Sequence, residues 1–151
     1  MRKIIFIVLV FCFTVSRAQY TKPYFNTYSI VNGLPEGNVT ASLQDKLGYM
    51  WFGTQNGLVR YDGYQLKQYP IPDDNGIPLI YCSIKLLHED KEGKLWALVD
   101  KEGLYYFNRQ TDAFYKVKTN KADVNLFRDY YFYDWAEDRL NHIHWLLGAD
   151  F

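Results

Sequence analysis

The feature that most constrains the fold of this chain is a repeated tryptophan. Trp51, Trp96 and Trp145 are separated by 45 and 49 residues, and similar sequences surround all three. A period of roughly 40–50 residues is typical of propeller blades and other stacked arrays, in which a single unit cannot bury its apolar face alone. The repeat therefore predicts several units that pack side by side.

Each of the first two units contains four short apolar runs separated by turn sequences. The expected strands are residues 39–44, 49–54, 58–61 and 64–69 in the first unit, and 83–88, 94–99, 104–107 and 113–118 in the second. Asn56-Gly57 and Asp62-Gly63 lie between strands, and such pairs supply the positive φ that tight hairpins need. Four short strands at this period are the pattern of a propeller blade.

The predicted fold class is all-β: an incomplete β-propeller with about two and a half four-stranded blades after a signal peptide. The third unit has expected strands at 132–136 and 143–147. Because ring closure takes typically four to eight blades, we expect the N-terminal part of a longer protein or a truncated reading frame. The expected divisions are a signal peptide (1–18), a lead-in (19–37), blade 1 (38–72), a loop (73–80), blade 2 (81–119) and a truncated blade 3 (120–151).

The N-terminus has the pattern of an export signal. Residues 1–3 are a short basic start, residues 4–15 are apolar, and Ser16-Arg17-Ala18 offers small residues for cleavage after Ala18. The apolar run is shorter than the roughly 20 residues that a transmembrane helix needs. An uncleaved anchor is the less favoured alternative. In the lead-in that follows, Tyr28, Ile30 and Val31 are expected to form a short strand.

Composition excludes several classes of partner and site. Loss of residues 1–18 would leave a net charge of −3, which gives no basic surface for nucleic acid or an anionic membrane. Cys82 would be the single remaining cysteine, so no internal disulfide framework is expected, and its apolar neighbours predict a buried side chain. Aromatic residues make up 19% of the chain, which fits half-buried β structure.

The residues that recur between units have structural explanations. We expect the tryptophans to fill the space between blades, the glycines to supply turn conformations, and the aspartates to accept hydrogen bonds from the backbone that follows them. The less favoured alternative for the aspartates is metal binding or acid–base catalysis. The recurring positions are Asp45, Gly48, Trp51, Gly53, Gly57 and Asp62, then Asp90, Gly93, Trp96 and Gly103, then Trp145 and Gly148.

No catalytic, cofactor-binding or metal-binding residue is predicted. His142 and His144 would share one face of a strand, but no third ligand is placed beside them, so a solvated face is favoured over a metal site. Several tyrosines could either pack between strands or line a sugar-binding surface, and the sequence leaves both options open. They include Tyr105, Tyr106, Tyr130, Tyr131 and Tyr133.

The segment from Gly33 to Tyr69 closely resembles the first blade of the two-component regulator propeller family. The family pattern is a G-L followed by N-x-V and then Q-D-x-x-G-x-x-W-x-G-T-x-x-G-L-x-R-Y-D-G. The matching residues are Gly33, Leu34, Asn38, Val39, Gln44, Asp45, Gly48, Trp51, Gly53, Thr54, Gly57, Leu58, Arg60, Tyr61, Asp62 and Gly63. The second unit departs from it, with Ala97-Leu98-Val99 in place of F-G-T and Asn108 in place of the last aspartate.

The resemblance implies the exported sensor half of a bacterial receptor, located in the periplasm of a Gram-negative cell. It also implies partners: further blades, a small β-sandwich, a transmembrane helix, and a cytoplasmic histidine kinase or DNA-binding output elsewhere in the same protein. Many members of the family are implicated in sensing polysaccharide fragments, so a carbohydrate ligand is expected. Two alternatives remain, a secreted propeller lyase or glycosidase and a scaffold that binds glycan or protein without signalling.

Overall fold

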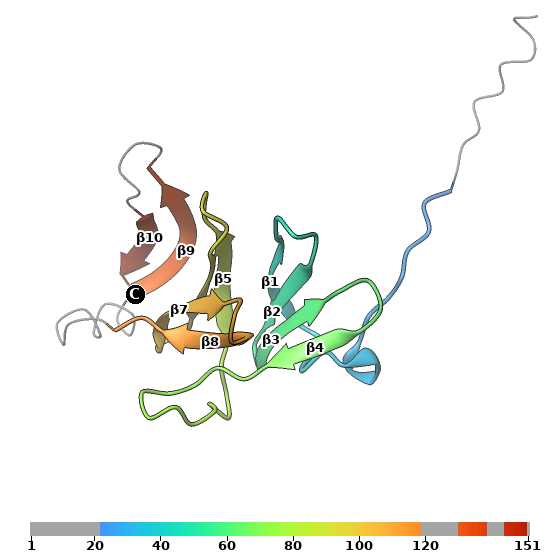
Figure 1. Cartoon of the computed structure of the whole chain (residues 1–151), viewed down its shortest axis with the longest axis horizontal. Helices are drawn as coiled ribbons and strands as arrows, with labels where there is room; N and C mark the ends of the chain where they lie inside the picture. Colours follow the sequence, from blue (N-terminus) through green and yellow to red (C-terminus); the bar gives the residue numbers. More distant parts are fainter. Residues whose placement is uncertain (1–21, 119–129, 139–143, 151) are drawn as a thin grey trace, which may run out of the picture.

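The protein folds into antiparallel β-sheets connected by short turns. The computed structural model describes residues 22–118, 130–138 and 144–150. Within these ranges the strands form two four-stranded sheets and one two-stranded sheet, with a single short 3-10 turn (Figure 1). The predicted all-β class is therefore confirmed. No helix of the described ranges is long and apolar enough to cross a membrane.

The two four-stranded sheets repeat one design, with neighbouring strands in chain order. The first sheet contains β1 (Val39–Gln44), β2 (Met50–Thr54), β3 (Gly57–Tyr61) and β4 (Leu66–Tyr69). The second contains β5 (Ile84–Glu89), β6 (Leu95–Val99), β7 (Gly103–Asn108) and β8 (Ala113–Lys116). All eight strands lie where the sequence predicts them, within two residues at each end. Aromatic, β-branched and turn residues thus specify each blade locally.

The third sheet pairs β9 (Tyr130–Glu137) with β10 (His144–Asp150). Both strands were expected in the third unit. β9 extends beyond its predicted range at both ends, and β10 extends beyond its range at the C-terminal end. The ladder is irregular between Leu147 and Gly148, where the pairing shifts by one residue. Trp145 pairs with Ala136 in this ladder, as Trp51 pairs with Leu43 in the first sheet.

The first strand of each sheet lies next to the first strand of the following sheet. β1 contacts β5, and β5 contacts β9, so the sheets stand beside one another as blades do (Figure 1). The core lies between the first two sheets, and Cys82 belongs to it, as its apolar neighbours predict. The buried cluster comprises Trp51, Leu58, Tyr69, Ile71, Cys82, Ile84, Leu95, Ala97, Val99, Tyr105, Phe107 and Phe114.

Two residues set how closely the first two sheets approach. A Cβ atom on Gly53 of β2 would lie 2.5 Å from Cγ2 and 2.6 Å from Cβ of Ile84 in β5. Ile84 is fully buried at this contact. Gly53 has a negative φ, which any residue can adopt. What matters at this position is therefore the absence of a side chain, not the backbone freedom of glycine.

The short strand expected around Tyr28, Ile30 and Val31 is wrong. Ile30–Asn32 form a 3-10 turn, η1, which ends at Gly33 with a φ of 108°. The Ser29 backbone N–H and hydroxyl both donate to Oδ1 of Asn32, at 3.0 and 3.1 Å. These local hydrogen bonds compete with strand pairing, which explains why β-favouring residues do not form a strand here.

Candidate functional site

Asp45 organises the turn between β1 and β2. Its Oδ1 accepts hydrogen bonds from the backbone N–H groups of Leu47 and Tyr49, both at 3.0 Å. Its Oδ2 accepts a hydrogen bond from Nε1 of Trp51 at 3.0 Å. The same carboxylate therefore closes the turn and fixes the indole ring that packs between the sheets.

Asp90 and Trp96 repeat this arrangement in the second sheet. Asp90 accepts from the backbone N–H of Lys94 at 2.8 Å and from Nε1 of Trp96 at 2.8 Å. The six-residue spacing from aspartate to tryptophan in both units thus places a buried carboxylate opposite an indole N–H. The sequence predicted only the backbone hydrogen bonds of these turn aspartates and not the bond from the indole N–H.

Arg109, in the turn between β7 and β8, ties the two sheets together. Its Nη1 lies 3.1 Å from Oδ2 of Asp45, and its Nη2 lies 3.1 Å from Oε1 of Glu89. The Asp45 side chain is inaccessible to solvent, and the Glu89 side chain is 7% exposed. One guanidinium therefore compensates two buried carboxylates from different blades, a task suited to the planar fork of arginine.

In each of the two four-stranded sheets, a lysine in the first turn contacts the following sheet. The backbone N–H of Lys46 donates to Oε2 of Glu89 at 2.7 Å. The side-chain ammonium of Lys46 donates to the backbone carbonyl of the residue after Glu89 at 2.8 Å. Lys91 repeats both contacts on the third unit, donating to Oε2 of Glu137 at 3.2 Å and to the next carbonyl at 2.9 Å. This recurrence relates the third unit to the other two even though its sequence is looser.

The charge of Asp45 should make the blade interface sensitive to acid. Burial raises the pKa of Asp45, but hydrogen bonds from Trp51, Arg109 and the backbone of Tyr49 outweigh it, so its pKa lies below the ordinary value. A depressed folded-state pKa stabilises the protein above the unfolded pKa, and this contribution disappears as pH falls below about 4. The Asp45 carboxylate should therefore support folding at neutral pH and lose that effect in acid.

Replacing this carboxylate tests the point directly. Asp45→Asn should lower the unfolding free energy at pH 7 by about 1–3 kcal/mol, because the amide cannot accept every bond now made to the two oxygens. The difference in unfolding free energy between this variant and the unmodified protein should shrink as pH falls below about 4. Urea denaturation at each pH measures this difference. Asp62→Asn, in an exposed turn, is the matched control. A gap that stays constant down to pH 3 would contradict the assignment.

Trp51 and Trp96, the two recurring tryptophans whose side chains the structure describes, occupy different environments. Trp51 is fully buried and lies 4.9 Å, ring centre to ring centre, from Phe107 of the second sheet. Trp96 is only half-buried, and it faces Trp135 of β9 at 5.9 Å. Trp145 lies in β10, and its side chain is outside the described residues. The first two rings thus both point toward the following blade.

The other recurring positions lie in turns or close approaches. Asp62 accepts backbone hydrogen bonds from Tyr64 and Gln65, and Asn108 accepts the equivalent pair in the second sheet, so the amide replaces the carboxylate without loss of the turn. Gly148 pairs with Phe132 in the third sheet. Positive φ angles occur at Gly48 (88°), Gly57 (131°), Gly93 (83°) and Gly103 (107°).

The tyrosines considered for a sugar surface separate into different groups. Tyr105 is fully buried and donates its hydroxyl proton to the carbonyl of Pro72 at 2.9 Å, so it cannot present a ring to a ligand. Tyr133 is 58% exposed, whereas Tyr106 is half-buried. The side chains of Tyr130 and Tyr131 lie outside the described residues.

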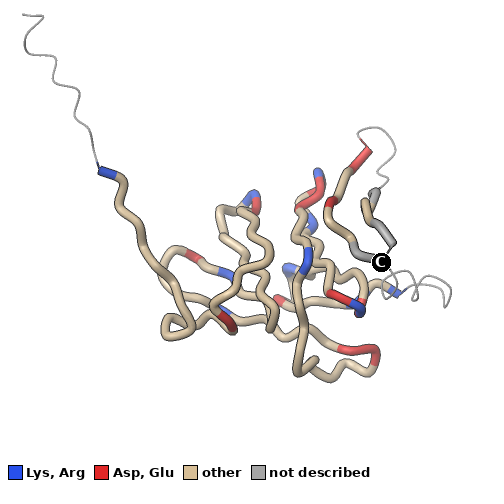
Figure 2. The backbone as a smooth tube through the Cα atoms, turned by 180° about the vertical axis from the view of Figure 1, so that it is seen from behind, with Lys and Arg blue, Asp and Glu red and all other residues tan. Residues whose placement is uncertain are grey.

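Within the described ranges, no group of three or more histidine, cysteine, aspartate or glutamate residues is placed to hold a metal ion. His144 begins β10, and His142 lies outside the described residues. Charged residues of both signs are distributed over both four-stranded sheets (Figure 2).

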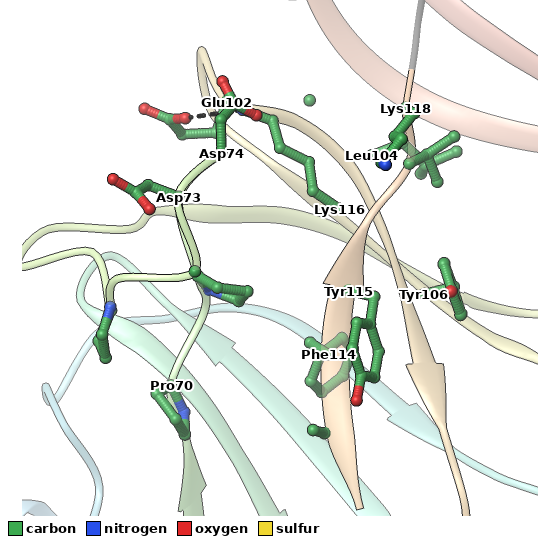
Figure 3. A pocket seen from close by; sticks show the side chains of 16 residues that line it. Pro70, Asp73, Asp74, Glu102, Leu104, Tyr106, Phe114, Tyr115, Lys116 and Lys118 are labelled. Atoms are coloured by element: carbon green, nitrogen blue, oxygen red, sulfur yellow. Dashed lines mark hydrogen bonds and ion pairs between the residues drawn. The ribbon is translucent and has the colours of Figure 1, made fainter. Parts of the chain in front are cut away.

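A cavity of about 940 Å³ lies beside β8 in the described part of the chain. It lies between β7–β8 and the loop that joins the first two sheets (Figure 3). Aromatic side chains, including Phe114 and Tyr115, line one part of it. Carboxylates from the loop and from Glu102 line another part (Figure 3).

Comparison with known proteins agrees with this geometry. The sequence model of the family described as "Two component regulator propeller" matches residues 33–56. A histidine kinase, P4 of Formosa agariphila, is 34% identical over 67 residues, which is 43% of this chain and 5% of the kinase. The crystal structure of the extracellular domain of a B. thetaiotaomicron protein, described as a hybrid two-component system, aligns with a TM-score of 0.54 and 25% identity. That alignment covers 67% of this chain and 14% of the other.

These findings define the class of protein. The chain is a β-propeller segment built from repeated antiparallel blades, and its first blade carries the motif of the two-component regulator propeller family. The predicted resemblance to this family is therefore confirmed, and the family model matches residues 33–56 of the predicted range. The chain spans only a small part of the length of both relatives.

Proposed function

We propose that this chain supplies the first blades of a sensing propeller in a two-component receptor. The observation that carries this proposal is the match of residues 33–56 to the two-component regulator propeller. It is supported by the similarity to a histidine kinase and to the extracellular domain of a two-component protein. The other blades, the membrane helix and the output domain would belong to the same protein.

The role proposed for these blades is binding without catalysis. The most buried carboxylates, Asp45, Asp90 and Glu89, are engaged by indole, backbone and guanidinium donors inside the blades. Glycoside cleavage instead requires two carboxyl groups that face a substrate from opposite sides of the bond. The commitment of these three carboxylates to blade packing supports a ligand-binding role for the blades.

The proposed ligand is a polysaccharide fragment, and the proposed location is the periplasm of a Gram-negative cell. Exposed tyrosine rings offer apolar faces with a polar tip, which suits contact with sugar rings. Tyr64 is 96% exposed, and Tyr81 is 81% exposed. The apolar run of residues 4–15 supports export, since it has the length of a secretory signal.

The test is a transcriptional response to oligosaccharides supplied outside the cell. A strain that carries the native gene is exposed to size-fractionated digests of several polysaccharides, and RNA levels are measured. One digest should induce a defined gene set at least about tenfold. The matched strain encodes the same protein without residues 1–18, and it should lose the response because the propeller is not exported.

The outcomes separate the proposed sensor from the alternatives. A response that persists without residues 1–18 would contradict an exported sensor. Cleavage of an oligosaccharide by the purified full-length protein would favour the enzyme. Binding of an oligosaccharide without any gene response would favour the non-signalling scaffold.

A further inference from the structure

The loop between the first two sheets forms a small hairpin beside β8. Pro72 and Pro78 form an isolated antiparallel bridge, and the backbone N–H of Leu79 donates to the carbonyl of Ile71 at 2.8 Å. The hydroxyl of Tyr105 anchors this hairpin to β7 through the carbonyl of Pro72. The hairpin therefore forms a fixed wall on one side of the cavity.

β8 forms the opposite wall and has one free edge. It pairs only with β7 among the described strands. The N–H of Val117 donates to the carbonyl of Leu104 at 2.8 Å, and hydrogen-bonded positions alternate along an antiparallel ladder. Tyr115 therefore bonds to β7, whereas the N–H and C=O groups of Phe114 and Lys116 point toward the free edge. Such an edge is a template for another strand.

One end of the cavity is acidic. The carboxylates of Asp73, Asp74 and Glu102 gather there (Figure 3). The ammonium of Lys116 lies 2.9 Å from Oδ1 of Asp74 and 3.3 Å from Oε2 of Glu102. These four side chains carry a net charge of −2, and Lys118 lies apart from them beside Leu104 (Figure 3). This end of the cavity would therefore attract a cationic group.

In the first sheet, another stretch of the chain lies beside the outer strand β4, at the position that the cavity occupies beside β8. There the lead-in runs beside β4, and Nε2 of Gln68 donates to the carbonyl of Gly33 at 3.2 Å. A Cβ on Gly33 would lie 3.5 Å from Cβ of Leu66. A stretch of polypeptide thus accompanies the outer strand of the first sheet, whereas the outer strand of the second borders the cavity.

We propose that this cavity is a docking groove for an extended, cationic peptide segment of a partner protein. The segment would add a fifth strand to the second sheet along β8, by main-chain hydrogen bonds to Phe114 and Lys116. Its lysine or arginine side chain would lie at the acidic end, near Asp74 and Glu102. Side chains on one face of the segment would contact the proline and aromatic residues of the groove. This site is distinct from the proposed sensing of carbohydrates and does not depend on it.

The test uses the purified full-length protein and a fluorescein-labelled hexapeptide of alternating threonine and valine that ends in two lysines. Binding is measured by fluorescence anisotropy. Lys116→Pro removes an outward N–H without removing a bond to β7, as edge strands tolerate. Lys116→Ala removes the same side chain and keeps that N–H. Far-UV circular dichroism and thermal melting establish that both variants fold.

We expect Lys116→Pro to weaken peptide binding at least about tenfold relative to Lys116→Ala. A probe methylated on alternate backbone nitrogens should bind at least about tenfold more weakly than the parent peptide, because it cannot pair with β8. Glu102→Gln should weaken binding, and added salt should weaken it further. Equal binding by the two Lys116 variants would overturn the proposal. So would failure of the peptide to bind at 1 mM, or displacement of the peptide by neutral oligosaccharides.

Discussion

Replacing Trp51 by alanine is expected to lower the free energy of unfolding by about 3–5 kcal/mol. The indole is fully buried, and it contacts aromatic rings from both sheets, Tyr69 at 5.2 Å and Phe107 at 4.9 Å between ring centres. Its removal would open a cavity at the centre of the interface between the blades. It would also take the Nε1 donor away from the buried carboxylate of Asp45.

The matched control is Trp96→Ala at the equivalent position of the second sheet. Trp96 makes the same hydrogen bond to its aspartate, but the ring is only half-buried, so we expect a smaller loss. Both variants are compared with the unmodified protein by chemical denaturation followed by far-UV circular dichroism, which does not depend on tryptophan emission. Equal losses at the two positions would contradict the view that burial between the first two sheets determines how much unfolding free energy each tryptophan contributes.

The strands were predictable because their signals are local. Short runs of aromatic and β-branched residues, and turns such as Asn56-Gly57, act over a few residues of the chain. The tryptophan period then identified the repeated unit. The lead-in was mispredicted because Ser29 donates hydrogen bonds to the side chain of Asn32. This local bonding competes with strand pairing, and the β propensity of the residues around Ile30 does not account for it.

The contacts that join the blades were not predictable in this way. Arg109 and Asp45 are 64 residues apart in the chain, and nothing in the sequence near either one identifies the other. The same is true of Lys46 and Glu89, although the pair recurs as Lys91 and Glu137. A search for basic residues directly after each turn aspartate, matched to glutamates one unit later, would have found this recurrence.

The cavity beside β8 arises where the β7–β8 hairpin meets a loop that lies earlier in the chain, with Pro72 and Tyr105 33 residues apart. The hairpin wall depends on the bridge between Pro72 and Pro78, and the sequence showed only a loop there. The sequence also left Tyr105 as a candidate for a ligand surface, whereas the structure commits its hydroxyl to Pro72. Polar groups of buried aromatic residues find partners that only the three-dimensional arrangement reveals.

Gly53 should also be needed for stability, for a different physical reason from Trp51. Gly53→Ala would place a methyl group 2.5 Å from Cγ2 and 2.6 Å from Cβ of Ile84. Rotation about χ1 can move Cγ2 away, but Cβ is fixed to the backbone of β5, so the two sheets must separate. We expect a loss of about 1–3 kcal/mol in unfolding free energy, measured by urea denaturation.

Gly37→Ala is the matched control, because a Cβ there meets no atom within 4 Å and the φ angle is not positive. That substitution should leave the stability unchanged or raise it by up to about 1 kcal/mol, through lower entropy of the unfolded chain. If Gly53→Ala behaved like Gly37→Ala, the close approach of β2 and β5 could not be a requirement of the fold. In a double-mutant cycle, a smaller cost of Gly53→Ala in an Ile84→Gly background, which removes both Cγ2 and Cβ, would locate the strain at this one contact between the blades.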